Sequence, residues 1–299
     1  MDKFIRKFPE LLSSLIKFDV PLASFTSYKI GGNVEFFIEP TEIVQLHEIV
    51  KILCENSIET KILAGGTNIL ISDENIAGAV ISLSKLKGFS IQNKTIYVNA
   101  GENLASIINK TANAGLSGLE TLAGIPGTVG GALIMNAGGK YGNISDFVKN
   151  VSVIDNNNEI QTLNSDEIVF GNRQSSLQDF IVVSAEFALN SGNADEINQR
   201  KKEILTEKTN SQPYNLPSAG CVFKNPKNKS AGILIDQAGL KGFRIGGAIV
   251  SIKHANFILN EENAKASDIL QLIRHIRQKV HEMHKINLDL EIKLWNLSV

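Results

Sequence analysis

The sequence lacks the features that mark membrane-spanning and nucleic-acid-binding proteins. Within its 299 residues, no run reaches the roughly 18 apolar residues that a membrane span requires. Residues 11–16 are too short, and too interrupted by serine, for the apolar part of a secretion signal. The 30 basic and 31 acidic residues are interleaved, so no basic stripe indicates a nucleic-acid ligand. We therefore expect neither a membrane nor a nucleic acid as a partner.

Cysteine is also scarce, since Cys54 and Cys221 are the two in the chain and lie far apart. One pair cannot form a disulfide framework, and we therefore expect a reducing, cytoplasmic compartment. Cys54 lies at the apolar end of a predicted helix and is expected in the core. His281 and His284 are three residues apart, but no cluster of cysteine or carboxylate accompanies them. We expect no metal site.

The glycine-rich segments match neither of two common nucleotide-binding signatures. No Gly-Lys-Ser/Thr follows at P-loop spacing, and no G-x-G-x-x-G is present. Two other loops are dense in glycine: Ala64-Gly65-Gly66-Thr67-Asn68, and Gly124-Ile125-Pro126-Gly127-Thr128-Val129-Gly130-Gly131, which is followed by Asn136-Ala137-Gly138-Gly139. Glycine lets backbone N–H groups approach a phosphate closely. The loops indicate a pyrophosphate-containing ligand, with tight turns and close packing as the alternative.

Hydrophobic periodicity predicts a mixture of strands and helices. Helical spacing predicts helices over 41–53, 104–114, 196–205, 231–238 and 267–284. Apolar runs and alternation predict strands that include 61–64, 69–71, 221–224 and 288–294, and a hairpin that joins 151–155 to 159–163. Hairpins mixed with helices indicate an α+β fold rather than a regular βαβ array.

Ordered segments along nearly the whole chain, from Phe25 to Glu291, resemble the UDP-N-acetylenolpyruvoylglucosamine reductases, the MurB family of UDP-N-acetylmuramate dehydrogenases. Each segment is modest evidence, whereas the ordered set is highly specific. The segments are Ala64–Asp73, Leu122–Gly131 with Met135–Gly138, Phe170–Ser175, Ser218–Pro226, Ala231–Gly247 and Lys253–Ile258.

The resemblance implies an architecture of the family's shorter subtype. FAD-binding domains of the vanillyl-alcohol-oxidase (PCMH) type are followed by a C-terminal α+β substrate domain. We expect an N-terminal lead at 1–22, FAD-binding subdomains at 23–86 and 87–209, and the substrate domain at 210–299. A loop with two prolines after Asn210 is an independent sign of the last boundary.

The resemblance also implies the activity and the cofactors. The expected reaction is reduction of UDP-N-acetylglucosamine enolpyruvate to UDP-N-acetylmuramate, for peptidoglycan precursors. Side chains cannot carry a hydride, and the resemblance implies non-covalent FAD that NADPH reduces. The expected contacts to FAD are Ala64, Gly65, Gly66, Thr67, Asn68, Ile69, Gly124, Ile125, Pro126, Gly127, Thr128, Gly130, Gly131, Asn136, Ala137 and Gly138.

Three residues are implied as catalytic. Arg173 would hold the carboxylate of the enol intermediate, and Glu291 would act on the same intermediate. Cys221 stands where the family usually has serine as proton donor, and Leu290 replaces the family's proline beside Glu291. Without the resemblance, Arg173 fits a solvated loop and Glu291 an exposed strand face, while Cys221 fits a small buried strand position.

Further residues are implied at the substrate. Lys224 and Asn225 are expected to meet the UDP-sugar. The weaker candidates, for contacts to diphosphate or carboxylate, are Lys241, Arg244, Lys253 and His254. The UDP-sugar is the expected partner, and no obligatory protein partner is evident.

Two other functions remain open from the residues alone. One is another FAD oxidoreductase of the same superfamily, such as an oxidase that uses O₂. It would need the glycine loops but not Arg173, Cys221 and Glu291 together. The other is a nucleotide-binding module without catalysis, which would bind UDP or FAD without consuming NADPH.

Overall fold

The structure is a computed structural model that describes residues 8–298. It divides into two compact units, each with its own buried hydrophobic core. Residues 1–7 of the predicted lead and Val299 lie outside the described residues. Unit 1 consists of Met1–Asp19, Glu35–Gly65 and Ala77–Glu207, and unit 2 of Val20–Val34, Gly66–Ile76 and Lys208–Val299.

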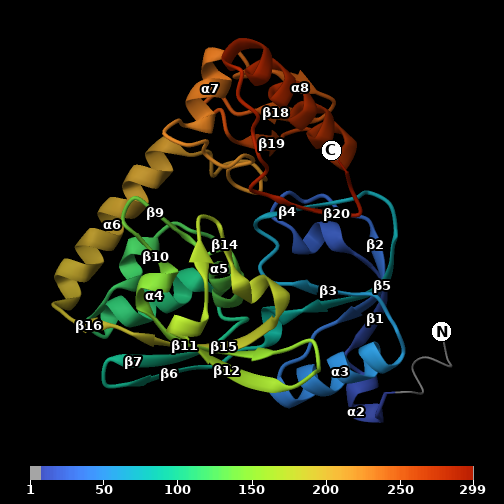
Figure 1. Ribbon diagram of the computed structural model, residues 1–299, viewed down its shortest axis with the longest axis vertical. Helices are drawn as coiled ribbons and strands as arrows, with labels where there is room; N and C mark the ends of the chain where they lie inside the picture. The colour runs from blue at the N-terminus through green and yellow to red at the C-terminus, as the bar shows by residue number, and fades with distance from the viewer. Residues whose placement is uncertain (1–7, 299) are drawn as a thin grey trace. The chain divides into compact units, whose positions relative to one another are not determined.

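Two sheets form the framework of unit 1 (Figure 1). One has the strand order β1-β2-β5-β3, in which β3 and β5 run parallel. The other has the order β12-β11-β15-β7-β6 with antiparallel pairing. Their strands are β1 (Ile16–Pro21), β2 (Asn33–Ile38), β3 (Thr60–Leu63), β5 (Ile76–Ser82), β6 (Phe89–Gln92), β7 (Thr95–Asn99), β11 (Val148–Ile154), β12 (Ile160–Asn164) and β15 (Ile181–Ala188).

Helix α3 (Ile43–Glu55) of unit 1 shows how local sequence defines an element. Gln45 accepts the backbone N–H of Glu42 at its start, which satisfies a donor that the helix leaves unpaired. Leu46, Ile49 and Leu53 then form its buried face. The other helices and the short strand pairs are α2 (Glu10–Ser13), α4 (Leu104–Asn113), α5 (Val129–Ile134), α6 (Ala194–Ser211), β8 (Leu116–Ser117) with β16 (Asn190–Ser191), β9 (Gly138–Gly139) with β10 (Gly142–Asn143), and β13 (Phe170–Gly171) with β14 (Gln174–Ser175).

Unit 2 combines a three-stranded sheet, ordered β17-β18-β19, with a parallel pair of β4 and β20. The pair joins Ile69 to Lys293 and Ile71 to Trp295, residues that lie 224 positions apart in the sequence. Its elements are η1 (Leu22–Phe25), β4 (Ile69–Ile71), α7 (Ala231–Gln237), β17 (Arg244–Ile245), β18 (Ala248–Val250), β19 (Ile258–Asn260), α8 (Ala266–His284) and β20 (Lys293–Trp295).

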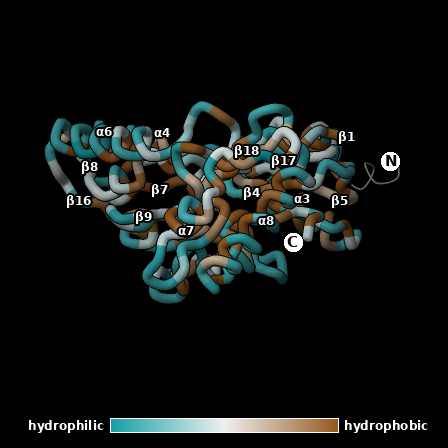
Figure 2. The backbone as a smooth tube through the Cα atoms, turned by 90° about the horizontal axis from the view of Figure 1, so that it is seen from above, coloured by the Kyte–Doolittle hydropathy of each residue, from teal (hydrophilic) through white to brown (hydrophobic). Residues whose placement is uncertain are grey.

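The helices differ in polarity along the chain. Figure 2 shows α6 mostly in the hydrophilic colour, whereas hydrophobic segments occur around β4 and α8. The buried side of α6 is limited to Ile197 and Ile204, while α8 buries Leu272, Ile276 and Val280 among others. No helix formed by residues 8–298 is both long and apolar enough to cross a bilayer.

The predicted α+β class is confirmed, with several corrections to single elements. The predicted strand over 288–294 is wrong in extent, because β20 covers Lys293–Trp295 and an isolated bridge lies at Leu290. Residues 221–224 likewise form isolated bridges rather than a regular strand. Cys54 was expected in the core but is exposed, because it follows Leu53 around the helix and leaves the buried face.

Candidate active site

The first glycine loop, residues 64–68, connects β3 to β4. A Cβ on Gly65 would lie 2.8 Å from the Cα of Gly127, so this position packs against the second glycine loop without room for a side chain. Gly66 has a φ of +62°, and a Cβ there would overlap the carbonyl oxygen of Phe25. Both positions therefore require glycine, as a loop that offers its backbone to a ligand does.

The second glycine loop, residues 124–131, ends in α5. Gly124 and Gly127 have φ values of +79° and +119°, which side-chain-bearing residues rarely adopt. The Thr128 hydroxyl accepts the N–H of Gly131 at 3.4 Å and so begins α5. A Cβ on Gly130 would lie 2.8 Å from the Cβ of Ala100. Backbone conformation accounts for Gly124 and Gly127, and close packing accounts for Gly130. Both leave a loop whose backbone groups are not covered by side chains at these positions.

Arg173 lies beside the segment that follows α5. Its Nη1 donates to the carbonyl oxygen of Gly138 at 2.8 Å, and it occupies the turn between β13 and β14 with a φ of +57°. Asn136, which is buried, donates from Nδ2 to the Gly171 carbonyl at 3.1 Å. Ser175 donates to the Leu133 carbonyl at 3.0 Å. The β13–β14 hairpin is therefore fastened to α5, and it brings Arg173 to the predicted FAD residues 136–138.

Cys221 and Glu291 lie on neighbouring segments of unit 2. The segments meet at an antiparallel bridge between Phe223 and Leu290. The N–H of Glu291 donates to the carbonyl of Val222, and the N–H of Lys224 donates to the carbonyl of Asp289, both at 2.8 Å. These bonds bring two of the three predicted catalytic residues together across 70 residues of sequence.

Asn68 of the first glycine loop is bonded to the Glu291 segment. Its Nδ2 donates to the carbonyl of Glu291 at 3.1 Å. Its own carbonyl accepts the N–H of Lys293 at 2.9 Å, directly before β4 and β20 pair. A residue predicted to contact FAD is therefore also a partner of the segment predicted to act on the substrate.

The predicted substrate residues of unit 2 separate into two groups. Asn225 accepts the N–H of Ala231 at 2.9 Å, and the ring of His254 lies 3.1 Å from where a Cβ on Gly232 would be. Both therefore lie at the start of α7, with Lys224 adjacent in sequence. Lys253 forms the second group. Its side chain is exposed, and its ammonium group donates to the Thr209 carbonyl at 2.6 Å.

Burial lowers the pKa of the His254 ring, and the positive charge of Lys241 lowers it further. Its Nδ1 faces the backbone N–H of Asn256 at 3.3 Å, so Nδ1 is the acceptor and the ring proton is on Nε2. The weaker candidates Lys241 and Arg244 are ion-paired with Asp236, and with Glu261, respectively.

The sequence patterns did not identify Asn256 as a residue of the site, although it lies in a segment that contributed to the resemblance. Asn256 is buried, and its side chain bonds both backbone polar groups of Phe223. The available signal was an asparagine inside the apolar run from Ala255 to Leu259, because a buried amide must find hydrogen-bond partners.

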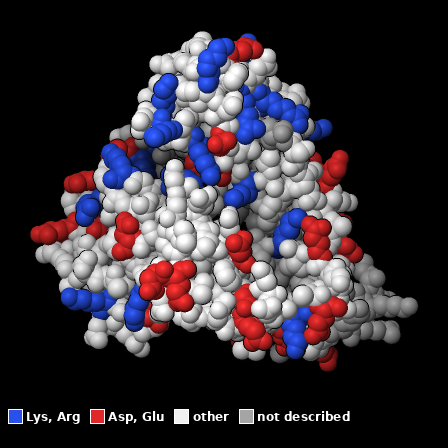
Figure 3. All heavy atoms as spheres, in the orientation of Figure 1, with Lys and Arg blue, Asp and Glu red and all other residues white. Residues whose placement is uncertain are grey.

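The two units differ in the balance of basic and acidic residues. Basic residues outnumber acidic ones in unit 2, and the reverse holds in unit 1. On the face drawn in Figure 3, Lys and Arg gather over the part that Figure 1 labels α7 and α8.

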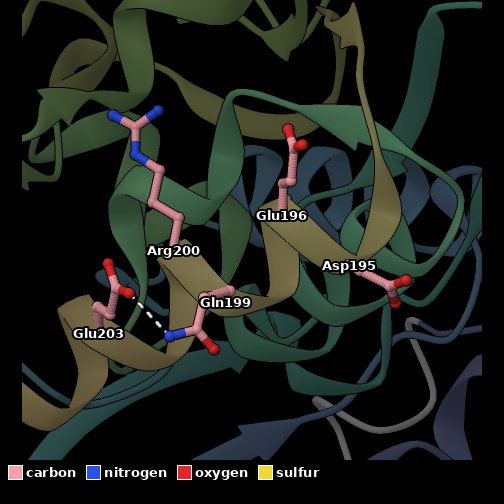
Figure 4. A pocket seen from close by; sticks show the side chains of 5 residues that line it. All are labelled: Asp195, Glu196, Gln199, Arg200 and Glu203. Carbon is pink, nitrogen blue, oxygen red and sulfur yellow. Dashed lines mark hydrogen bonds between the residues drawn. The ribbon is translucent and has the colours of Figure 1, made fainter.

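A surface pocket in unit 1 has a polar lining from one helix, α6 (Figure 4), and contains none of the predicted site residues. Its lining is Asp195, Glu196, Gln199, Arg200 and Glu203.

That pocket has the properties of a solvated helix surface. Gln199 donates to Glu203 at 2.8 Å, the bond drawn in Figure 4, and Arg200 lies 3.6 Å from the buried carboxylate of Glu120. Among the described residues, no group of three or more His, Cys, Asp and Glu side chains could hold a metal ion.

Comparison with known sequences gives consistent matches. A family model for the C-terminal domain of UDP-N-acetylenolpyruvoylglucosamine reductase matches residues 212–295, and an FAD-binding domain model matches residues 34–164. The UDP-N-acetylenolpyruvoylglucosamine reductase of Synechococcus sp. is 42% identical over 280 residues, which cover 92% of each chain.

Comparison with solved structures agrees. The crystal structure of UDP-N-acetylenolpyruvylglucosamine reductase from Thermus caldophilus aligns with a TM-score of 0.82 and 34% identity, over 94% of this chain and 99% of that one. Phl p 4, a glucose dehydrogenase, aligns over 64% of this chain and 44% of its own, with a TM-score of 0.50 and 18% identity. The second likeness concerns the fold alone.

Proposed function

The chain belongs to the UDP-N-acetylenolpyruvoylglucosamine reductase family, and from this premise we propose how its residues divide the work of the reaction. The chain is an FAD-dependent oxidoreductase that uses NADPH to reduce UDP-N-acetylglucosamine enolpyruvate to UDP-N-acetylmuramate, a step of peptidoglycan precursor synthesis. The observation that carries the assignment of residues is the pair of hydrogen bonds that link Cys221's segment to Glu291 and Glu291 to Asn68.

The glycine loops fit FAD. At Gly65 a Cβ would occupy the space where the two loops meet, so both can present backbone groups to a pyrophosphate. We propose that residues 64–69, 124–131 and 136–138 hold the cofactor. When bound, FAD supplies the hydride chemistry that the side chains lack.

We propose a non-covalent mode of FAD binding, because neither glycine loop contains the histidine or cysteine that a covalent link would need. Precipitating the purified yellow protein with acid should release the flavin into the supernatant, where its absorbance can be measured. Flavin that stays with the precipitated chain would exclude this mode.

Arg173 is assigned to the carboxylate of the enolpyruvyl group. Negative charge grows there as the double bond is reduced, and a planar guanidinium can bond two carboxylate oxygens at once. The bond from Nη1 to Gly138 limits the rotation of the guanidinium. Arg173 therefore orients the substrate as well as stabilising its charge.

Cys221 and Glu291 are assigned to the proton-dependent part of the reaction. The carbon next to the reduced position must receive a proton, and a protonated thiol at Cys221 can donate it. The carboxyl group of Glu291 stabilises the enol-like intermediate. Their adjacent segments support a shared role at one end of the substrate.

The basic character of unit 2 supports binding of the UDP-sugar by Lys224, Asn225, Lys253 and His254. We propose the substrate domain at 210–299 and the FAD-binding subdomains at 23–86 and 87–209. We also propose a cytoplasmic location, because neither cysteine is part of a disulfide. The UDP-sugar is the proposed partner, without an obligatory protein, nucleic acid or membrane.

The decisive test separates two half-reactions. NADPH is added anaerobically to the FAD-loaded protein, and bleaching of the flavin absorbance is recorded. UDP-N-acetylglucosamine enolpyruvate should then restore the absorbance with formation of UDP-N-acetylmuramate. Restoration by O₂ with turnover of small alcohols, but not by the enolpyruvyl substrate, would instead identify an oxidase. Flavin that NADPH cannot bleach would identify a binding module.

A further inference from the structure

Asn256 uses its side chain to complete the backbone hydrogen bonding of a single residue. Its Oδ1 accepts the N–H of Phe223 at 2.9 Å, and its Nδ2 donates to the carbonyl of Phe223 at 2.8 Å. The side chain thereby pairs with Phe223 as the peptide group of a neighbouring strand would. Asn256 is 3% exposed and Phe223 is 1% exposed, so water cannot replace either bond.

The backbone of Asn256 extends the same attachment. Its carbonyl accepts the N–H of Val222 at 2.8 Å, and Phe257, next in sequence, forms an antiparallel bridge with Cys221. Asn256 and Phe257 together hold three consecutive residues that begin with Cys221. On its other side the same segment is bonded to Glu291 and Asp289.

The segment around Cys221 has particular need of such an attachment. It makes isolated bridges rather than a regular ladder, and Gly220 before it has a φ of +77°, where the chain turns. A regular strand would be held by successive pairs along its length. Here one buried amide replaces a missing pair two residues from the thiol.

We propose that Asn256 is a positioning residue for Cys221. It fixes Val222 and Phe223, and through them it sets the direction in which the thiol presents its proton to the substrate. Asn256 itself contacts neither substrate nor cofactor in this role. The inference rests on the proposed role of Cys221 as the proton donor.

The principal experiment is a double-mutant cycle on flavin reoxidation. Reduced FAD-loaded protein is mixed with saturating substrate in a stopped-flow instrument, for the natural chain, Asn256→Ala, Cys221→Ala and the double variant. Asn256→Ala should slow reoxidation about 10- to 100-fold, since displacement of a reacting group by about 1 Å has that effect. Reduction by NADPH should change by less than about twofold. In the Cys221→Ala background, Asn256→Ala should add less than about twofold, because the two residues act as one unit.

Asn260→Ala is the matched control. Asn260 is also buried, and its side chain makes two hydrogen bonds, to the Tyr28 carbonyl and from the Ala264 N–H. Neither bond involves residues 221–224. The control should lower thermal stability in a similar way but leave the ratio of the two half-reaction rates unchanged. If Asn256→Ala and Asn260→Ala changed the ratio of the two half-reaction rates equally, the proposal would be overturned.

A second readout does not depend on turnover. In a Cys54→Ser background, the rate at which iodoacetamide alkylates Cys221 is measured by mass spectrometry. Asn256→Ala should change this rate several-fold, and Asn260→Ala should not. Natural protein whose flavin the substrate cannot reoxidise would disprove the proposed function, while the alkylation rates would still report whether Asn256 sets the exposure of the thiol.

Asn256→Asp serves if the alanine variant does not fold. It keeps the volume and the acceptor for Phe223 N–H but removes the donor to the carbonyl. Selective slowing of reoxidation in this variant supports the proposal. Failure of both Asn256 variants to fold, while Asn260→Ala folds, would assign Asn256 to folding and overturn the positioning role.

Discussion

The two glycine loops and the Cys221–Glu291 segments of unit 2 are built by opposite means. The loops depend on absent side chains, since a Cβ at Gly65 or Gly130 would collide with neighbouring atoms. The unit 2 segments depend on hydrogen bonds between residues far apart in sequence. In the proposed assignment, backbone therefore holds the FAD cofactor, whereas a network of hydrogen bonds between distant residues holds the groups that act on the substrate. Substitutions should therefore fail in different ways in the two regions.

The largest effect is expected where the two glycine loops touch. Gly65→Ala must push apart the loop backbones, and overpacking of this kind costs roughly 1–3 kcal/mol. We expect FAD affinity to fall about 10- to 100-fold, and the variant to purify with little flavin and little activity. Gly139→Ala is the control, since a Cβ there would meet nothing within 4 Å. Normal flavin content in Gly65→Ala, from its visible spectrum, would contradict a tightly packed cradle.

The next effect concerns Cys221 and leaves FAD binding intact. Cys221→Ala should slow reoxidation by substrate about 100-fold or more, as loss of a general acid does, with NADPH reduction unchanged. In the natural chain, reoxidation should decline as pH rises, because thiols ordinarily lose their proton near pH about 8.5. Cys221→Ser should keep substantial activity without that alkaline decline. Stopped-flow rates across pH measure both features, and full-speed turnover by the alanine variant would make Cys221 a packing residue.

Glu291→Gln should have an effect of comparable size, again confined to one half-reaction. Loss of a group that stabilises developing charge typically costs about 100- to 1000-fold, and the enol intermediate exists only during reoxidation. The isosteric amide keeps the backbone bonds to Val222 and Asn68. Transient kinetics in which both half-reactions slow equally would show that Glu291 acts on structure instead.

The features that the sequence could predict follow the same division, between structure set by one short segment and structure set by distant residues. The glycine loops, and helices such as α4 and α7, depend on residues within one short segment, and sequence patterns located them. The strand predicted over 288–294 was wrong in extent, although burial of Leu288 and Ile292 follows the expected alternation. Regular pairing there depends on residues 69–71, which no local pattern can specify. Asn256 was missed for the same reason, since its partner Phe223 lies 33 residues away.

The smallest predicted effect is on the stability of unit 1, away from either region. Burial would raise the pKa of Glu39, but its bonds to Lys17 and Lys85 outweigh burial and lower it. A carboxyl group with a lowered pKa stabilises the fold above its unfolded pKa, and this stability is lost as pH falls through the folded value. Glu39→Gln should cost roughly 1–3 kcal/mol at neutral pH, and urea titrations should show the difference shrinking in acid.

Glu59→Gln provides the comparison for Glu39. Glu59 pairs with Lys61 at 2.7 Å, but its side chain is 70% exposed, and exposed pairs contribute little. Its removal should leave the urea midpoint nearly unchanged. If Glu59→Gln lowered the free energy of unfolding as much as Glu39→Gln does, burial would not explain why the two ion pairs differ in their contribution to stability.

The parallel pairing of β4 with β20 has a consequence for how the chain is made. The partner of Ile69–Ile71 is Lys293–Trp295, and those residues are translated long after β4. All of unit 1 has been translated once Glu207 is reached, whereas unit 2 continues beyond it. The first glycine loop, which leads directly into β4, is therefore anchored on its β4 side only once Lys293–Trp295 have been translated, and a nascent chain that stops short of them lacks this support.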